Sequence, residues 1–264
     1  MFEPQNIYQY MDNPMGKGST AIFNRKYIQD DLNKRYYNLL KAKKDFSYSI
    51  YSSKDKYYFH FKIPSETSRE NTYDVVLEFY IAYDEAIKND TTIKRYNLRF
   101  FSNSPNFVYT YANVYKQYDL LITFLANKYP DVVLKEEPTI KNPGSIINYD
   151  KSLYFACMYI TTHKELMNKT VIASKSKPMN VKMFSKLIRN SEQIMVEIKK
   201  EESKLTRAAK FKDKSILNKR KIDKPDNTAR NDIGPPPKKT NKITPKKAKA
   251  KITAKPKVKP KKKI

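Results

Sequence analysis

The chain is poor in the residues from which many reactive centres are built. It has one cysteine, Cys157, and two histidines, His60 and His163, among 264 residues. A single cysteine cannot form a disulfide within the chain or supply a cysteine-based metal site. The composition suits a reducing compartment and excludes a small scaffold that is held together by disulfides.

Long apolar runs are also missing. No stretch approaches the roughly 20 consecutive apolar residues that a membrane-spanning helix needs. The segment Met1–Tyr10 has neither the basic start nor the apolar centre of a secretory signal peptide. We therefore expect a soluble protein with no membrane partner.

Negative charge is scarce relative to positive charge. The chain has 53 lysines and arginines against 27 aspartates and glutamates, a formal net charge of +26. Residues 204–264 contain 23 of the basic residues and 4 of the acidic ones, so they carry 19 of these charges, and the rest of the chain carries +7. Such an excess implies an anionic partner: nucleic acid, an anionic membrane surface or an acidic protein.

The end of the chain has the composition of a disordered segment. Residues 238–264 contain 13 lysines, 3 prolines and no acidic residue, and they follow the stiff spacer Pro235–Pro237. Low hydrophobicity, charge repulsion and proline prevent a packed core, which predicts a disordered tail over 211–264. The repeated lysines, alanines and prolines resemble the tails of linker-histone-like and other DNA-condensing proteins.

Lysines in such a tail displace counterions from phosphates and do not read bases, so the expected contact with nucleic acid is non-specific and salt-sensitive. A membrane partner is less favoured because the tail has no lipidation site and no aromatic anchor. A nuclear-import signal would have a similar composition. The predicted nucleic-acid-binding residues are Lys238, Lys239, Lys242, Lys246, Lys247, Lys249, Lys251, Lys255, Lys257, Lys259, Lys261, Lys262 and Lys263.

The preceding part of the chain has the hydrophobic pattern of an α+β fold. Apolar residues at helical spacing predict a helix over 20–44, and period-two alternation predicts strands after it. The expected strands cover 46–50, 57–63, 73–81 and 93–101. Short polar loops between them favour an antiparallel meander. Residues 107–114 can add a fifth strand, with a helix as the alternative.

Four regions follow from this pattern. We expect a flexible N-terminal arm over 1–18, an α+β domain over 19–165, a helical extension over 178–210 and the tail over 211–264. Within the domain, 151–163 has the pattern of a buried helix because almost no polar face remains. The apolar stripe of 181–210 predicts a long C-terminal helix.

No group of residues has the spacing of a catalytic or metal site. The segment Gly16–Thr20 precedes a helix, but a P-loop needs a glycine where Met11 stands and a strand before it. A basic, glycine-containing helix start could still hold a phosphate; a flexible arm with a helix cap is the simpler interpretation. His60 and His163 are isolated, and an apolar environment should raise the pKa of the Cys157 thiol and keep it inert. We therefore expect no enzyme activity, no cofactor and no metal.

The aromatic run Phe107–Tyr118 has the composition of a base-stacking surface. Lys94, Arg95 and Arg99 lie nearby in the sequence, and cations among aromatic rings bind single strands. The alternation of the run favours instead an aromatic core face of the sheet.

Three segments, 13–19 (NPMGKGS), 100–107 (FFSNSPNF) and 151–156 (KSLYFA), resemble small structural proteins of tailed phages of AT-rich bacteria. The resemblance implies a virion structural protein and transfers no active-site residue. The leading hypothesis is a non-enzymatic protein, in the virion or host cytoplasm, whose body docks among other virion proteins while the tail contacts packaged nucleic acid. The alternative is a DNA-binding accessory protein of replication or packaging whose body also touches nucleic acid.

Overall fold

The chain divides into two units, residues 1–215 and 216–264, and every residue that the computed structural model describes belongs to the first. The predicted tail over 211–264 and the segment Gly16–Thr20 lie outside the described residues. The described residues are 4–14, 25–42, 46–66, 71–82, 84–134, 141–200 and 203–204.

A five-stranded sheet forms the centre of the first unit. Its strands are β1 (Ser47–Ser53), β2 (Lys56–Pro64), β3 (Thr72–Tyr80), β4 (Asn97–Ser102) and β5 (Ser176–Pro178). The order across the sheet is β4-β3-β2-β1-β5. The first four strands form the predicted antiparallel meander, so the α+β prediction is confirmed. The fifth strand pairs in parallel with β1 and makes the sheet mixed.

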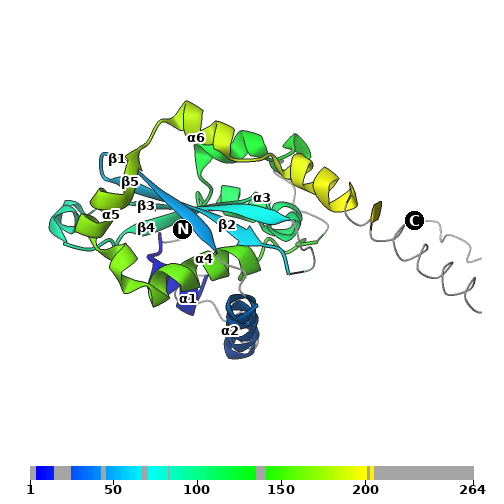
Figure 1. Cartoon of the computed structure of the whole chain (residues 1–264), viewed down its shortest axis with the longest axis horizontal. Helices are drawn as coiled ribbons and strands as arrows, with labels where there is room; N and C mark the ends of the chain where they lie inside the picture. Colours follow the sequence, from blue (N-terminus) through cyan, green and yellow to red (C-terminus); the bar gives the residue numbers. More distant parts are fainter. Residues whose placement is uncertain are drawn as a thin grey trace, which may run out of the picture. The chain divides into compact units, whose positions relative to one another are not determined.

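One face of the sheet is packed against a helical layer. The residues of β2 that alternate toward this face include Phe59 and Phe61, which are fully buried. Helix α4 (Lys151–Thr162) lies across them, with its Tyr159 ring 5.6 Å from that of Phe61. Helices α1 (Ile7–Asp12) and α2 (Arg25–Lys41) pack against α4 and form the outside of this layer (Figure 1). The prediction of a buried helix over 151–163 is confirmed.

The opposite face is covered mainly by α6 (Val181–Leu187). Its Phe184 is 1% exposed and lies against Tyr51 of β1, Tyr58 of β2 and Phe124 of η3 (Thr123–Lys128). Figure 1 shows α6 on the side of the sheet away from α4. The sheet is therefore buried on both faces, which explains why β3 has almost no exposed residue.

The remaining elements connect these layers. A π-helix, η2 (Phe107–Tyr111), runs directly into α3 (Ala112–Gln117). Helix α5 (Lys169–Lys175) leads into β5. Short 3-10 helices complete the described part: η1 (Glu85–Asn89), η4 (Asp131–Leu134) and η5 (Lys164–Met167).

Two sequence predictions need correction. Residues 107–114 are helical and do not form the fifth strand. The expected flexible arm over 1–18 contains α1. The Asn6 side chain accepts hydrogen bonds from the backbone of the first turn, and the Gln9 side-chain oxygen accepts one from the Asn6 backbone N–H. Ile7 and Tyr10 then anchor this helix in the core.

The long C-terminal helical stretch is confirmed over 181–200, with one interruption after α6 at Ile188–Asn190. It does not extend away from the domain, because Phe184, Ile188 and Ile194 are each at most 1% exposed. Within the expected helical extension over 178–210, these three side chains are therefore buried.

Candidate functional site

The thirteen lysines predicted to contact nucleic acid, Lys238 to Lys263, all lie outside the described residues. On the body, basic residues concentrate in one segment. Residues 164–189 contain seven lysines and arginines against one acidic residue, Glu165. This segment of α5, β5 and α6 thus carries +6 of the +7 that belongs to residues 1–203.

Two of the seven cations are already engaged. Lys169 donates to the backbone oxygens of Lys88 (2.7 Å) and Ile87 (3.3 Å), and its amine lies 5.0 Å from the centre of the Tyr96 ring. Arg189 is bound to carboxylates and backbone at the far end of α6. Neither side chain is available as a free cation.

Four other lysines form what we call the basic edge: Lys175, Lys177, Lys182 and Lys186. All four side chains are exposed. Within the described part of the chain, no carboxylate forms an ion pair with any of them. The basic edge is therefore a set of uncompensated positive charges.

The backbone positions these lysines firmly. The amide of Asn180 starts α6 by accepting from the Met183 backbone N–H at 3.0 Å. Successive helical residues are turned by about 100°, so Lys182 and Lys186, each two residues from the buried Phe184, point away from the sheet. Lys177 lies in β5, opposite Tyr51 of β1.

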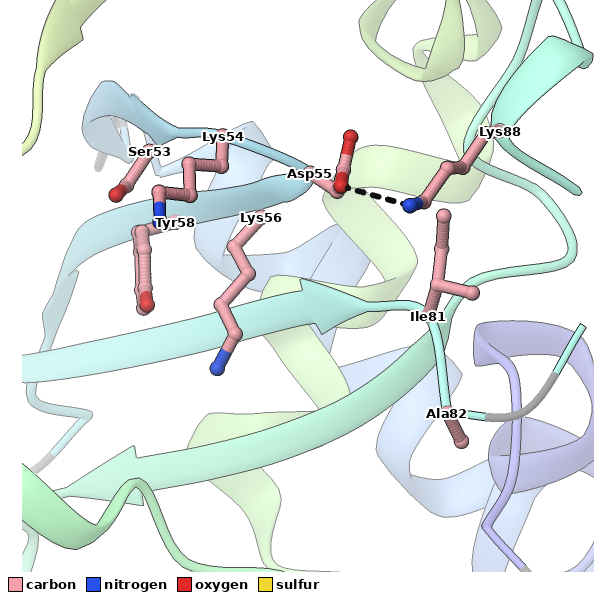
Figure 2. Close-up of a pocket in the computed structure, with 8 residues that line it drawn as sticks. All are labelled: Ser53, Lys54, Asp55, Lys56, Tyr58, Ile81, Ala82 and Lys88. Carbon is pink, nitrogen blue, oxygen red and sulfur yellow. Dashed lines mark ion pairs between the residues drawn. The ribbon is translucent and has the colours of Figure 1, made fainter. Parts of the chain in front are cut away.

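A second group of lysines lies beside the β1–β2 turn and is called the lysine pocket. The pocket has a volume of about 500 Å³, and Lys54, Lys56 and Lys88 line it together with Asp55. Figure 2 shows Lys54 and Lys56 on the side of Tyr58, with the Asp55–Lys88 ion pair of 3.3 Å on the other. Counting also Glu78, which pairs with Lys56, three lysines meet two carboxylates at the pocket, a net charge of 3 − 2 = +1.

Lys56 forms an ion pair with a buried carboxylate. Its amine donates to Oε1 of Glu78 at 2.8 Å, and Glu78 is only 3% exposed. Lys54 has a φ of 49°, which a lysine rarely adopts, at the first position of the two-residue turn. Two-residue hairpin turns require positive φ, so the turn accounts for this conformation.

The basic edge and the lysine pocket are neighbours along β1. Tyr51 is in register with Lys177, Ser52 accepts a 2.8 Å hydrogen bond from the Met179 backbone, and Ser53 lines the pocket. Two strand spacings and two residues along a strand separate the Cα atoms of Lys177 and Lys56, roughly 12 Å. That exceeds the Debye length of about 8 Å at physiological salt, so the two groups of lysines act largely as separate charges, within reach of one extended polyanion.

A buried polar cluster lies on the same face of the sheet. Asp74 is fully buried and accepts hydrogen bonds from Nδ2 of Asn103 (3.0 Å) and Nε of Arg189 (2.9 Å), and its Oδ1 is 2.9 Å from Nε2 of His60. Burial alone would raise the pKa of Asp74, but the hydrogen bond with His60 and the charge of Arg189 outweigh it and hold this pKa well below its ordinary value.

This cluster corrects the expectation that His60 has no carboxylate near it. His60 is 6% exposed, and the Phe184 ring covers it at a centroid distance of 5.9 Å. A histidine–carboxylate pair closed off in this way has no room for a substrate. Arg189 also donates to the backbone oxygen of Thr72 at 2.6 Å, so the cluster fastens the end of α6 to β3.

The structure places Cys157, His163, Phe107 and Tyr115 in packing contacts. Cys157 is fully buried, and burial raises the pKa of its thiol, as predicted. His163 ends α4 and stacks on Tyr159 at 4.2 Å. Phe107 and Tyr115 of the aromatic run are fully buried, so they offer no surface for stacking bases. Among the described residues, no cluster of three potential metal ligands occurs.

Comparison of the chain with family models, curated proteins and solved structures found no match. No helix in the described ranges is both long enough and apolar enough to cross a bilayer. The basic edge was missed because the sequence reasoning counted the charge of residues 1–203 as one total. A count by segment would have found it.

Proposed function

We propose that this chain is a non-enzymatic, nucleic-acid-binding structural protein of a virus particle. Its folded body docks among other virion proteins, and residues 204–264 contact packaged nucleic acid. The observation that carries the proposal is the segregation of charge, since 19 of the 26 net positive charges fall within these 61 residues. A polyanion is the partner that such a density of lysine fits.

The contact is electrostatic and non-specific. Lysines that neutralise phosphates release condensed counterions, and each contact adds about 0.9 to the slope of log affinity against log salt. Residues 238–263 contain no arginine, no aromatic residue and a single asparagine, so they lack the side chains that usually read bases. We therefore expect similar affinity for unrelated sequences and a steep loss of affinity with salt.

The experiment uses the full chain. In the tail-neutral variant, all 13 lysines from Lys238 to Lys263 are replaced by glutamine. Binding to a fluorescein-labelled DNA duplex is measured by anisotropy between about 50 and 200 mM salt. The unchanged chain should lose roughly 10³-fold or more in affinity between about 50 and 200 mM salt, as expected for six or more phosphate contacts. The tail-neutral variant should bind more weakly at low salt and show a much shallower salt slope.

A second variant with the residues of 238–264 in shuffled order is the matched control. It keeps composition and charge, so it should bind like the unchanged chain if the contact is electrostatic. Equal affinity of the tail-neutral and unchanged chains would contradict the proposal. So would loss of binding on shuffling, because that result requires a specific sequence.

Location is tested separately by mass spectrometry of purified particles. Presence at a fixed copy number supports a structural role. Absence from particles would contradict it and favour the second candidate, an accessory protein of replication or packaging. The basic edge and the lysine pocket are the observations that favour this alternative, because they let the body itself touch nucleic acid.

A further inference from the structure

We propose that the basic edge and the lysine pocket together form a second phosphate-binding surface, on the folded body, for the backbone of double-stranded nucleic acid. The inference rests on the proposed function, because it assumes the same class of partner. It goes further by assigning a site to the body and by naming the residues that make it.

The first step is the concentration of free charge. Segment 164–189 has a net charge of +6, and four of its lysines, Lys175, Lys177, Lys182 and Lys186, are exposed without a carboxylate partner among the described residues. Lysines placed on one surface without compensating carboxylates repel one another, so they are costly to keep together. An anion that bridges them removes that cost.

The second step is rigidity. The basic edge is fixed at three places: by the pairing of β5 with β1, by Phe184 against Tyr51 at 4.7 Å, and by Arg189 on Asp74 at 2.9 Å. The lysines thus start from a fixed backbone, and only their side chains lose freedom when a ligand binds. Preorganisation of this kind raises affinity without adding contacts.

The third step is continuity with the lysine pocket. Lys54, Lys56 and Lys88 line a hollow of about 500 Å³ (Figure 2). Lys88 pairs with Asp55 and Lys56 with Glu78, so the pocket keeps a net charge of 3 − 2 = +1. The buried Glu78 holds the Lys56 amine at the pocket. One phosphate can enter the pocket while its neighbours along the strand lie over the basic edge.

The chemistry of the surface selects the backbone of a duplex among anionic partners. Phe184 is the single aromatic residue of 164–189, and Tyr58 lines the pocket. Both are buried, at 1% and 5% exposure, so neither ring is available to stack the bases of a single strand. The amides of Asn168 and Asn180 cap α5 and α6, and Arg189 is bound to Asp74, so no side chain of these types remains to read base edges.

A membrane surface fits less well. Val181, Met183 and Leu187 are exposed beside the lysines, but α6 has only seven residues and lacks an aromatic anchor. Interfacial helices rely on a long apolar face with aromatic or leucine residues. Three scattered apolar side chains do not supply that face.

The test is made in the full-length tail-neutral chain, so that the lysines of 238–263 do not mask the body. The edge variant carries Lys175→Gln, Lys177→Gln, Lys182→Gln and Lys186→Gln. The control variant removes the same number of exposed lysines elsewhere, at Lys26, Lys34, Lys41 and Lys141. Circular dichroism and thermal unfolding check that both variants fold.

Duplex affinity of the edge variant should fall at least about tenfold at low salt. Its salt slope should become shallower by roughly 3 to 4, because each lost phosphate contact removes about 0.9. The control variant should lose less than about threefold. A pocket variant, Lys54→Gln with Lys88→Gln, should show a smaller loss in the same direction; Lys56 is left in place to keep Glu78 paired.

Equal losses in the edge and control variants would overturn the inference, because net charge alone would then explain binding. It would also be overturned if the edge variant kept duplex affinity but lost binding to single-stranded DNA, to polyglutamate or to phosphatidylserine vesicles. The proposed function fails on a different result, namely unchanged affinity of the tail-neutral chain relative to the unchanged chain.

Discussion

Replacing Asp74 by asparagine removes one charge from the centre of the buried polar cluster and changes almost no volume. The carboxylate of Asp74 accepts from Asn103 and Arg189, and its other oxygen meets His60. In the variant, one of these groups faces the amide NH2, and the Arg189 guanidinium has no anion at Asp74 to neutralise it.

The magnitude follows from burial. Removing one partner of a buried ion pair costs about 3–5 kcal/mol, because the other charge stays in a poorly solvated place. Asp74 is fully buried, but the Arg189 side chain is 26% exposed and its charge is partly solvated by water. We therefore expect the lower end, about 3 kcal/mol for Asp74→Asn.

The assay is urea denaturation at neutral pH. With a slope of about 3 kcal/mol per molar urea or less, the midpoint should fall by about 1 M or more. Asp84→Asn is the matched control: Asp84 pairs with Arg95 at 3.2 Å, but both side chains are about half exposed. Such a surface pair contributes less than about 1 kcal/mol.

The pH dependence gives a second readout. The folded-state pKa of Asp74 lies below the ordinary value, so its stabilisation is fully present above about pH 4 and is lost as the pH falls toward the folded-state pKa. The stability difference between the unchanged chain and Asp74→Asn should therefore shrink below about pH 4. A midpoint shift no larger than that of Asp84→Asn, or a difference independent of pH, would refute the reasoning.

Three other perturbations test the packing. Phe184→Ala should lower the free energy of unfolding by about 3–5 kcal/mol in urea denaturation, because it empties the contact between α6 and the sheet; a change below 1 kcal/mol would contradict that role. Burial would raise the pKa of Glu66, but Arg35 and Lys151 outweigh it and lower this pKa to about 2. Glu66→Gln should thus weaken the loss of stability seen in acid titrations between about pH 4 and 2, and an unchanged profile would contradict it. Cys157 should react with a thiol reagent only after unfolding, and rapid labelling of the native chain would show that it is accessible.

Strand alternation was the most informative part of the sequence. It predicted β1 to β4 and their order, because apolar and polar residue types alternate in β1 and β2 and the connections are short. It could not find β5, whose three residues, Ser-Lys-Pro, include no apolar side chain. That strand exists because α5 and α6 on either side of it are fixed to the domain.

The aromatic run predicts a strand, whereas the structure has a π-helix there, for a physical reason. Phe107, Tyr109 and Tyr111 alternate like a strand, but the backbone forms a π-helix in which Ala112 N–H donates to the Phe107 oxygen. The five-residue turn places Phe107 and Ala112 on the same buried side. Alternation over so few residues does not distinguish this arrangement from a strand.

Two helix starts have capping residues that are visible in the sequence. Asn6 and Gln9 form a capping box at α1, and the Gln193 side-chain oxygen accepts a 3.0 Å hydrogen bond from the Asn190 backbone N–H where the helix restarts after α6. The lysine pocket, in contrast, could not be predicted. Lys54 and Lys88 are far apart in sequence, and only the turn of β3 into η1 brings them to one hollow.

Arg189 links the segment that carries the basic edge to the sheet. Arg189 binds Asp74 of β3 just after α6, so the backbone that carries these lysines is held against the sheet. Residues 204–264 follow this segment in the chain. Under the two proposals above, the body and the tail raise each other's effective concentration on a duplex, so together they should bind it more tightly than their separate affinities suggest. On this reasoning, weakening the cluster at Asp74 should lower the contribution of the body to DNA binding while leaving that of Lys238 to Lys263 intact.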